Sequence, residues 1–362
     1  MNHLKEGITT GACAALCAYG AVKAALGEAQ DKAVVYNPHG LPIKGDITAA
    51  RLPDGKGVCR TVKHSGDDPD VTDGVTVAVT AELIPGDKVE IRGGRGIGRV
   101  TKKGLDRPPG DWAINSGPRK MIEAAVQKAA AECGRCTGAC ITVEIPGGEE
   151  LARRTFNPRL GIEGGLSVLG TDGILRPMST AALIDTIRAE LSVKRSQGLE
   201  NITLCPGRTG EEAAMLLGIP PENIAQCSNF IGEALDAAAE QGFSSALLVG
   251  HIGKTVKLGS GVFNTHSRTA DARMETLAAC GVFAGVDPAV LRGLDGFVSA
   301  DAAVKYLCEA GVWEKVAAEL GRRSDRYLAA RAGIPCGVAW FGGKNTLLGM
   351  SEGAKTILER EK

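Results

Sequence analysis

The segment "LVGHIGKTVKLGSGVFNTHSR", residues 248–268, holds four glycines and two of the chain's five histidines. His251 and His266 are fifteen residues apart, and with Asn264 they could ligate a metal ion or transfer a proton. A third ligand at a suitable spacing is missing. The alternative is that His251 ends a strand and Asn264 shapes a turn, and the segment alone leaves both interpretations open.

The "GHIGKT" part of this segment has the composition of a phosphate-binding P-loop. Such a loop needs a glycine five residues before its Gly-Lys pair, because its backbone must curl around the phosphates. This chain has Leu248 at that position. A P-loop is therefore not expected here.

Two charged stretches in the first half could meet the polar groups of a ligand. "HSGDDPDVTDG" gathers four aspartates, among them Asp68 and Asp70, and suits a turn, a cation or the donor groups of a ligand. "RGGRGIGRVTKKGLDR" is basic and rich in glycine, so it could form charge-assisted hydrogen bonds with several carboxylates of one ligand. A solvated turn or hairpin is the alternative for each stretch.

Three cysteines, Cys133, Cys136 and Cys140, stand at spacings that a zinc or iron–sulfur site could use. Because no fourth ligand stands close by in the sequence, burial at a helix–strand junction is the favoured interpretation. The chain has 11 cysteines, an odd number, and no secretory leader precedes them. This pattern predicts reduced thiols in a cytoplasmic protein.

Composition narrows the class of partner. Lys plus Arg and Asp plus Glu both total 42, so no overall field attracts nucleic acid or an anionic membrane. Apolar runs such as "AMLLGIP" are far shorter than the ~18 to 20 residues of a membrane span. Glycine occurs 49 times and aromatic residues make up only 4 %. We therefore expect a small-molecule ligand, held by glycine-rich loops.

A length of 362 residues suggests two domains. Residues 1–155 combine a small-residue helix that begins at Thr9 or Thr10, mostly antiparallel strands between residues 32 and 103, a second helix and a returning strand, which predicts an α+β two-layer domain. Residues 156–362 alternate short strands with helices, then become helical before a last strand or hairpin. That rhythm predicts a Rossmann-like α/β domain with a mainly parallel sheet.

Ligands of such a sheet bind beyond the carboxyl ends of its strands. Three glycine-rich loops are expected at that edge, at residues 170–173, 207–210 and 250–254. The first of them reads "LGTDG". The sequence therefore does not assign a cofactor to any one of the three loops.

Seven motifs in order closely resemble the CbiD family, the cobalt-precorrin-5B C1-methyltransferases of anaerobic cobalamin biosynthesis. They are "GITTGACAALCA", "GDDPDVTDG", "IRGGRGIGRVTKKGL", "AINSGPRKMI", "NPRLGIEGGLSVLGTDGI", "CSNFIGEALDAA" and "LVGHIGKTVKLGSGVFNTHSR". The resemblance spans about residues 7–350, nearly the whole chain. It implies an α+β domain paired with a Rossmann-like one, in agreement with the pattern of elements.

The resemblance also implies a reaction. S-adenosylmethionine would donate a methyl group to C1 of a cobalt-bearing tetrapyrrole, giving cobalt-precorrin-6A and S-adenosylhomocysteine. Cobalt would arrive with the substrate, so no separate protein-bound metal is implied. Transient contact with other corrin-pathway enzymes and homo-oligomer formation stay open, as do two other functions: a corrin-binding protein without catalysis and a nucleotide-using α/β enzyme.

Candidate site residues follow from these motifs. The candidates for handling a proton are His251 and His266. The candidates for binding the cofactor are Gly170, Thr171, Asp172, Gly173, Gly250 and Gly253. The candidates for binding the substrate are Thr9, Thr10, Asp68, Asp70, Arg92, Arg95, Arg99, Lys102, Lys254, Asn264 and Arg268.

Overall fold

The small-residue run "TGACAALCAYGAVKAA" forms helix α1 (Thr10–Ala25), all of whose residues are buried. The Thr9 hydroxyl accepts a hydrogen bond from the Ala12 N–H, so the predicted N-cap is confirmed. Small side chains let the neighbouring backbone come very close. A methyl group added at Gly57 would lie 1.8 Å from the Ala21 carbonyl oxygen.

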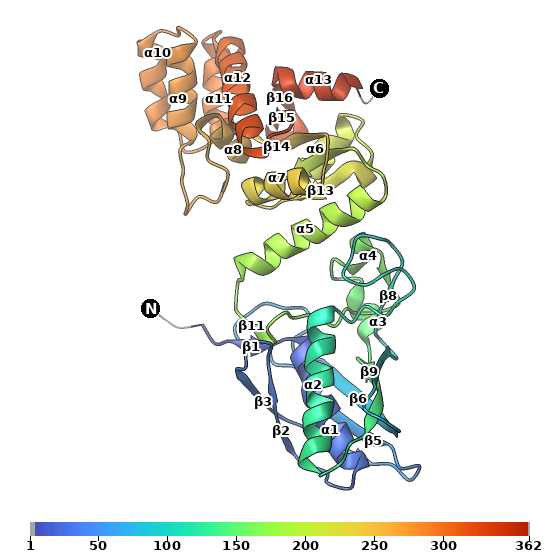
Figure 1. The fold of residues 1–362 in the computed structure, drawn as a ribbon. Coiled ribbons are helices and arrows are strands. Elements are labelled where there is room, and N and C mark those ends of the chain that lie inside the picture. The colour runs from blue at the N-terminus through green and yellow to red at the C-terminus, as the bar shows by residue number, and fades with distance from the viewer. Residues whose placement is uncertain (1–3, 361–362) are drawn as a thin grey trace. The chain divides into compact units, whose positions relative to one another are not determined.

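The structure is a computed structural model that describes residues 4–360, and it divides into two units between Thr180 and Ala181 (Figure 1). Besides α1, the first unit contains β1 (Gly7–Ile8), β2 (Lys32–Tyr36), β3 (Pro42–Asp46), β4 (Thr48–Arg51), β5 (Gly57–Val62), β6 (Thr76–Ile84), β7 (Val89–Gly93), β8 (Arg99–Val100), α2 (Ser116–Glu132), β9 (Gly138–Glu144), α3 (Gly148–Ala152), α4 (Asn157–Leu160), β10 (Ile162–Glu163) and β11 (Ile174–Leu175).

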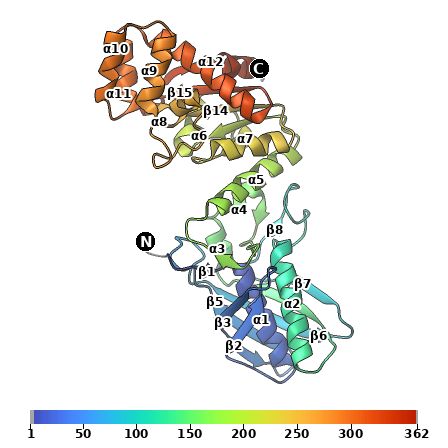
Figure 2. The same cartoon turned by 60° about the vertical axis from the view of Figure 1, so that its left-hand side comes forward.

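A five-stranded sheet in the order β4-β5-β6-β9-β7 supports α1 in the first unit. Its pairs are antiparallel except β7 with β9, so the antiparallel sheet predicted for this region is confirmed with one parallel exception. Helix α2 and the β2–β3 ribbon pack against α1 as well (Figure 2). The helix therefore lies inside the core of this unit, surrounded by strands and by a second helix.

Residues beyond 155 still belong to the first unit. Strand β10 pairs with β8, and β11 pairs with β1 at the start of the chain. The division after Thr180 thus differs from the division after residue 155 expected from the sequence. These pairings join residues far apart in sequence, so no local pattern announces them.

The second unit alternates strands and helices. It contains α5 (Thr180–Ser196), which starts at the boundary, β12 (Asn201–Cys205), α6 (Arg208–Leu216), η1 (Pro221–Asn223), β13 (Ile224–Gln226), α7 (Ile231–Glu240), β14 (Ser245–His251), α8 (Ile252–Thr255), η2 (Val256–Ser260), α9 (Arg273–Phe283), α10 (Pro288–Arg292), η3 (Gly293–Gly296), α11 (Ala300–Glu309), α12 (Trp313–Ala332), β15 (Cys336–Phe341), η4 (Gly343–Asn345), β16 (Leu347–Met350) and α13 (Glu352–Arg360).

The sheet of the second unit has the order β13-β12-β14-β15-β16. Its first four strands are parallel and β16 is antiparallel, so the predicted mainly parallel sheet and its closing hairpin are confirmed. Alternate residues of β14 enter different cores: Leu248 packs with α7 and α12, whereas Val249 packs with α6 and α13. The sheet is therefore covered on both faces, as a buried parallel sheet requires.

One predicted strand is wrong. "LSVLGTDG" was expected to open the Rossmann-like sheet, but Leu166 and Val168 form bridges with Ile97 and Ile114 of the first unit. The alternation of apolar residues in this segment reflects burial in the core of the first unit. Within residues 4–360, no helix combines the length and the apolar character that crossing a membrane requires.

A methyl group at Gly57 tests the close packing around α1. Gly57→Ala would drive Cβ into the Ala21 carbonyl and the Ala25 N–H, which are backbone atoms that cannot rotate away. We expect a loss of about 3 kcal/mol or more, measured as a lower unfolding midpoint by circular dichroism. Gly296→Ala is the matched control because nothing lies within 4 Å of its added methyl; equal midpoints for the two variants would contradict this packing.

The Asp325 carboxyl gives a pH-dependent prediction. One of its oxygens accepts the Gly353 N–H at 2.8 Å, while the other is buried without a hydrogen-bond partner among residues 4–360. Burial raises the pKa of this carboxyl. The folded state therefore binds the proton more tightly than the unfolded state, so the charged carboxylate destabilises the fold at neutral pH and this cost disappears as the pH falls below the unfolded pKa.

Asp325→Asn removes that charge at every pH. We expect the variant to unfold at higher denaturant than the parent at pH 7 and the difference to shrink toward pH ~4, near the ordinary pKa of an aspartate. Equilibrium urea unfolding across this range measures it. Glu359→Gln, which neutralises an exposed carboxylate in the adjoining α13, is the control; an Asp325→Asn variant less stable than the parent at pH 7 would contradict the burial argument.

Candidate functional site

The carboxyl edge of the parallel sheet gathers the loops that follow β12, β13, β14 and β15. Strand β12 is followed in the chain by β13, which lies on one side of it, whereas β14 is followed by β15, which lies on the opposite side. The direction of strand order therefore reverses between β12 and β14. Ligands of open α/β sheets bind at such a reversal. Gly250, at the end of β14, lies close to Pro206 of the loop after β12: an added methyl would be 3.0 Å from the proline ring.

Lys254 projects from this point. Its ammonium donates a hydrogen bond to the Pro206 carbonyl at 3.1 Å and has no carboxylate partner among residues 4–360. Burial lowers its pKa, and the neighbouring Cys227 works in the opposite direction. Burial raises the pKa of the Cys227 thiol to about 12, so this thiol stays neutral. The lysine is thus a half-buried cation whose charge the protein does not balance locally.

Both ring nitrogens of His251 have neighbours. Nδ1 accepts the Gly253 N–H at 3.1 Å, and Nε2 lies 3.3 Å from the Asp301 carboxylate. A nitrogen that accepts a hydrogen bond carries no proton, so the ring proton belongs on Nε2. Asp301 also accepts the Gly343 N–H at 2.9 Å. His251 and Asp301 therefore connect the end of β14, the start of α11 and the loop after β15. Both nitrogens of the His251 ring are engaged in these contacts, so neither is open to an outside proton.

Asn264, His266 and Arg268 lie in the loop before α9. The Asn264 side chain accepts the His266 N–H, and His266 Nδ1 accepts the Arg268 N–H, each at 3.1 Å. Buried Lys257 fixes this loop through the carbonyls of Thr265 and Ala270. The His266 imidazole is exposed, and its Nε2 has no partner among residues 4–360.

The same loop is anchored at the carboxyl edge. Thr265 N–H donates to the Asn229 carbonyl at 3.0 Å, and Asn264 bridges with Phe230, directly after β13. His251 and His266 therefore share one edge of the sheet, and no contact joins the two imidazoles in the part of the chain that the structure describes. The structure thus brings the two histidines to one edge without making a pair of them.

Three residues of this edge that the sequence did not single out adopt left-handed backbone conformations: Ser228, Lys344 and Asn345, with φ of 52°, 56° and 56°. Non-glycine residues rarely adopt this region, and strained positions of this kind cluster at functional sites. Asp301 was also missed, because nothing in "SADAA" distinguishes a loop-bridging carboxylate from an ordinary residue in the first turn of a helix.

The loop Gly170–Gly173 lies elsewhere. It packs over the start of α1 in the first unit, where the Thr9 N–H donates to the Gly173 carbonyl and the Gly11 N–H donates to the Leu169 carbonyl. The expectation that this loop ends a strand of the parallel sheet is therefore wrong. Asp172 pairs with Arg176 at 2.6 Å, and an added methyl at Gly170 would lie 2.2 Å from the Thr9 hydroxyl oxygen.

Thr9 and Thr10 are engaged within the protein. The Thr9 hydroxyl caps α1, and the buried Thr10 hydroxyl accepts the Leu169 N–H at 2.9 Å. Together these threonines fix the loop that contains Thr171 against the helix. The cap at Thr9 is the predicted one, whereas the bond from Leu169 to the Thr10 hydroxyl was not foreseen.

Asp68 and Asp70 also have partners in the first unit. Asp68 accepts the Met178 N–H at 2.9 Å, and Asp70 lies 3.0 Å from the ammonium of Lys63, which is 1 % exposed. Burial acts to raise the pKa of Asp70, but hydrogen bonds from Thr72 and the charge of Lys63 outweigh it, so the pKa is lowered. Asp70 therefore serves first to neutralise a buried lysine.

The basic stretch, residues 92–107, begins at the end of β7 and continues through β8. Because β7 pairs with β9 and β8 pairs with β10, the predicted hairpin is wrong. Arg92 pairs with Glu90 at 2.8 Å. Arg99 lies 3.5 Å over the Trp112 ring and donates to the Gly110 carbonyl. The side chains of Arg95 and Lys102 have no polar partner among residues 4–360. Of the four predicted cations, two are thus free to bind a ligand.

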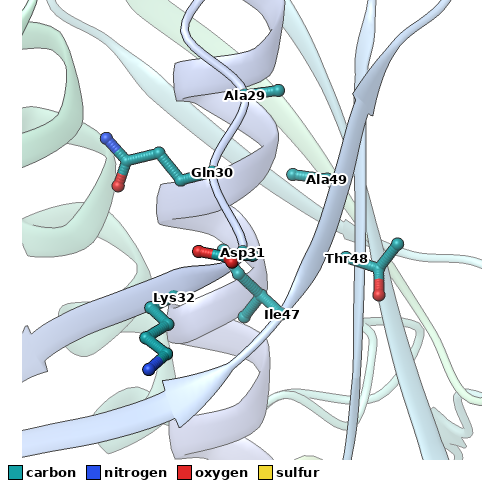
Figure 3. Close-up of a pocket in the computed structure, with 7 residues that line it drawn as sticks. All are labelled: Ala29, Gln30, Asp31, Lys32, Ile47, Thr48 and Ala49. Atoms are coloured by element: carbon teal, nitrogen blue, oxygen red, sulfur yellow. The ribbon is translucent and has the colours of Figure 1, made fainter.

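The cysteines Cys133, Cys136 and Cys140 are free thiols, and Cys140 lies within β9. Across residues 4–360, no three His, Cys, Asp or Glu side chains are grouped as metal ligands. An open hollow in the first unit lies beside the segments Ala29–Lys32 and Ile47–Ala49 (Figure 3). None of the predicted site residues lines it.

Comparisons with known proteins agree with the motifs. A family model described as CbiD matches residues 1–177, and one described as "CbiD, C-terminal domain" matches residues 264–352. The chain is 38 % identical to the cobalt-precorrin-5B C(1)-methyltransferase of Ruminiclostridium cellulolyticum, over 91 % of this chain and 86 % of that protein. The chain belongs to the CbiD family.

Other relatives extend the match over nearly the full length. Proteins with the same name from Photorhabdus laumondii and Moorella thermoacetica are 36 % and 38 % identical, each over 99 % of this chain and over 96 % and 98 % of their own lengths. A crystal structure of the cobalamin biosynthesis protein (cbiD) from Archaeoglobus fulgidus is 27 % identical, covers 75 % of this chain and 84 % of that chain, and has a TM-score of 0.41. The family resemblance in the sequence is confirmed.

The hydrogen bond from the Gly253 N–H to His251 Nδ1 predicts different losses of stability for two substitutions of His251. His251→Ala removes the acceptor that caps α8, whereas His251→Asn keeps a side-chain oxygen that can accept the Gly253 N–H. We expect the alanine variant to lose about 1 kcal/mol and the asparagine variant less than half of that. Urea unfolding and amide exchange at Gly253 measure the difference; equal losses would show that the cap contributes nothing.

Proposed function

We propose that this chain is a cobalt-precorrin-5B C(1)-methyltransferase that transfers the methyl group of S-adenosylmethionine to C1 of the cobalt-bearing macrocycle. The observation that carries the proposal is the near full-length similarity to relatives with this name, 36–38 % identical over 99 % of this chain. The products would be cobalt-precorrin-6A and S-adenosylhomocysteine. Cobalt belongs to the substrate in this proposal.

The transfer is a displacement at a sulfonium carbon. The bond from sulfur to the methyl group breaks as a bond from C1 to the methyl group forms, so C1 supplies the electron pair and the sulfonium becomes a thioether. Such a step needs alignment of the two reactants and exclusion of water more than it needs a nucleophilic side chain. The absence of a free nitrogen on His251 is compatible with this chemistry, and exposed His266 is the better candidate for handling a proton.

We place the cofactor at the carboxyl edge of the second unit. Support comes from the reversal of strand order between β12 and β14 and from the close approach of the Pro206 ring to Gly250 and of the His251 ring to Gly253. Lys254, a half-buried cation that has no carboxylate partner among residues 4–360, suits a carboxylate of a ligand at that edge. The Gly170–Gly173 loop has lost the structural argument for a cofactor role, because it belongs to the first unit.

Product formation by the purified chain tests the proposal. We expect anaerobic incubation with cobalt-precorrin-5B and methyl-labelled S-adenosylmethionine to add one labelled methyl to the macrocycle, seen by mass spectrometry and assigned to C1 by NMR. Lys254→Met, which keeps the length of the side chain without its charge, should slow the transfer about tenfold or more. Binding of the macrocycle without transfer of label would contradict the proposal and favour a corrin-binding protein.

A further inference from the structure

Two segments of the first unit that are far apart in sequence lie side by side. The turn and strand at residues 95–102 contact the segment 148–161 at both of its ends (Figure 1, near β8, α3 and α4). An added methyl at Gly148 would lie 2.3 Å from the Gly96 carbonyl oxygen, and one at Gly161 would lie 2.4 Å from the Lys102 side chain. These close contacts thus fix segment 148–161 along residues 96–102 of the basic stretch.

Hydrogen bonds confirm the same alignment. The Ile145 N–H donates to the Arg95 carbonyl at 2.9 Å, just before the second segment begins. The Thr101 N–H donates to the Gly161 carbonyl at 2.8 Å, where that segment ends. The chain between these two anchors is therefore held beside residues 95–101 at both of its ends.

The two segments carry exposed arginine side chains. Arg153 and Arg154 follow α3 and are exposed, and their guanidinium groups have no partner among residues 4–360. Arg95 is exposed in the same way. By contrast, Arg92 pairs with Glu90, and Arg99 is held over Trp112. Three guanidinium groups are thus available here, and each can bind a carboxylate through two parallel hydrogen bonds.

An exposed aromatic ring lies two residues beyond the arginine pair. Phe156 is 42 % exposed at the start of α4, although a phenylalanine is usually buried. Free guanidinium groups beside an uncovered ring suit a flat conjugated ligand with anionic substituents on its rim. Acids also lie close: the Glu144 carboxylate accepts the Arg95 backbone N–H at 3.3 Å, and Glu149 and Glu150 are exposed in the first turn of α3.

We infer that Arg153, Arg154 and Phe156, together with Arg95, form a binding surface for the carboxylates and one face of the tetrapyrrole macrocycle. The identity of that macrocycle rests on the proposed function. The surface itself rests on the alignment of the two segments, the free guanidinium groups and the exposed ring. It adds three residues to the predicted substrate-binding set, in which Arg92 and Arg99 already have partners within the protein.

Charge reversal in the full-length chain tests this surface. The variant Arg153→Glu/Arg154→Glu should bind uroporphyrin, a macrocycle edged with acetate and propionate groups, about tenfold or more weakly than the parent. Titration followed by the porphyrin absorbance band gives the Kd, and calorimetry with S-adenosylmethionine should give an unchanged Kd. Arg153→Lys/Arg154→Lys keeps the charge without the bidentate geometry and should lie between the two. Phe156→Ala should weaken binding a few-fold.

The matched control is Arg51→Glu/Arg60→Glu. These two exposed arginines belong to the same unit, on β4 and β5, at the opposite side of the strand order from β7. The control makes the same change of net charge, so it should bind uroporphyrin within twofold of the parent. Parent-like binding by Arg153→Glu/Arg154→Glu, or equal weakening in the control, overturns the inference.

Turnover separates this inference from the proposed function. If the parent methylates cobalt-precorrin-5B, the Arg153→Glu/Arg154→Glu variant should show a raised KM for the macrocycle, and an unchanged KM overturns the inference. If the parent binds uroporphyrin but transfers no methyl group, the proposed function fails, and the comparison of Kd values still decides the surface. Equal unfolding midpoints of variant and parent establish that a loss of binding reflects the surface and not the fold.

Discussion

The complete burial of α1 is the constraint on which the first unit depends. A helix surrounded by strands and by α2 must be made of small residues, and its polar groups must be matched inside the protein. Lys23 donates to Glu28, and this bond raises its pKa, so the buried ammonium stays charged. Burial and the hydrogen bond to Glu132 raise the pKa of Tyr19 to about 12. The recognisable "TTGACA" motif is therefore explained by packing and capping.

The second unit meets a different requirement. Its sheet is covered on both faces, so the strands reach solvent only near their ends, where loops can present side chains to a ligand. The carboxyl edge shows this: among residues 4–360 Lys254 has no carboxylate partner, Ser228 has a left-handed backbone, and His251 contacts Gly253 and Asp301. The regular strands and helices below these loops stabilise the unit enough to tolerate such local strain.

The sequence predicted the elements well because each has a local pattern: the cap at Thr9, the alternation in β6, the strand–helix rhythm after residue 196. It failed where partners are distant. "LSVLGTDG" looks like a sheet strand, yet its partners Ile97 and Ile114 lie more than fifty residues earlier. The site followed the same rule. Histidines and glycine-rich loops were visible as motifs, whereas Asp301 and Arg153 gain their meaning only from what the fold brings beside them.

The border strands of the second unit's sheet determine whether another chain can extend it. Its border strands are β13, with three residues, and β16, with four and an irregular register against β15. A long, flat border strand would offer a row of unpaired N–H and C=O groups on which another chain could extend the sheet. Strands this short provide almost no such template. Copies of this chain are therefore not expected to associate by extending the sheet of the second unit.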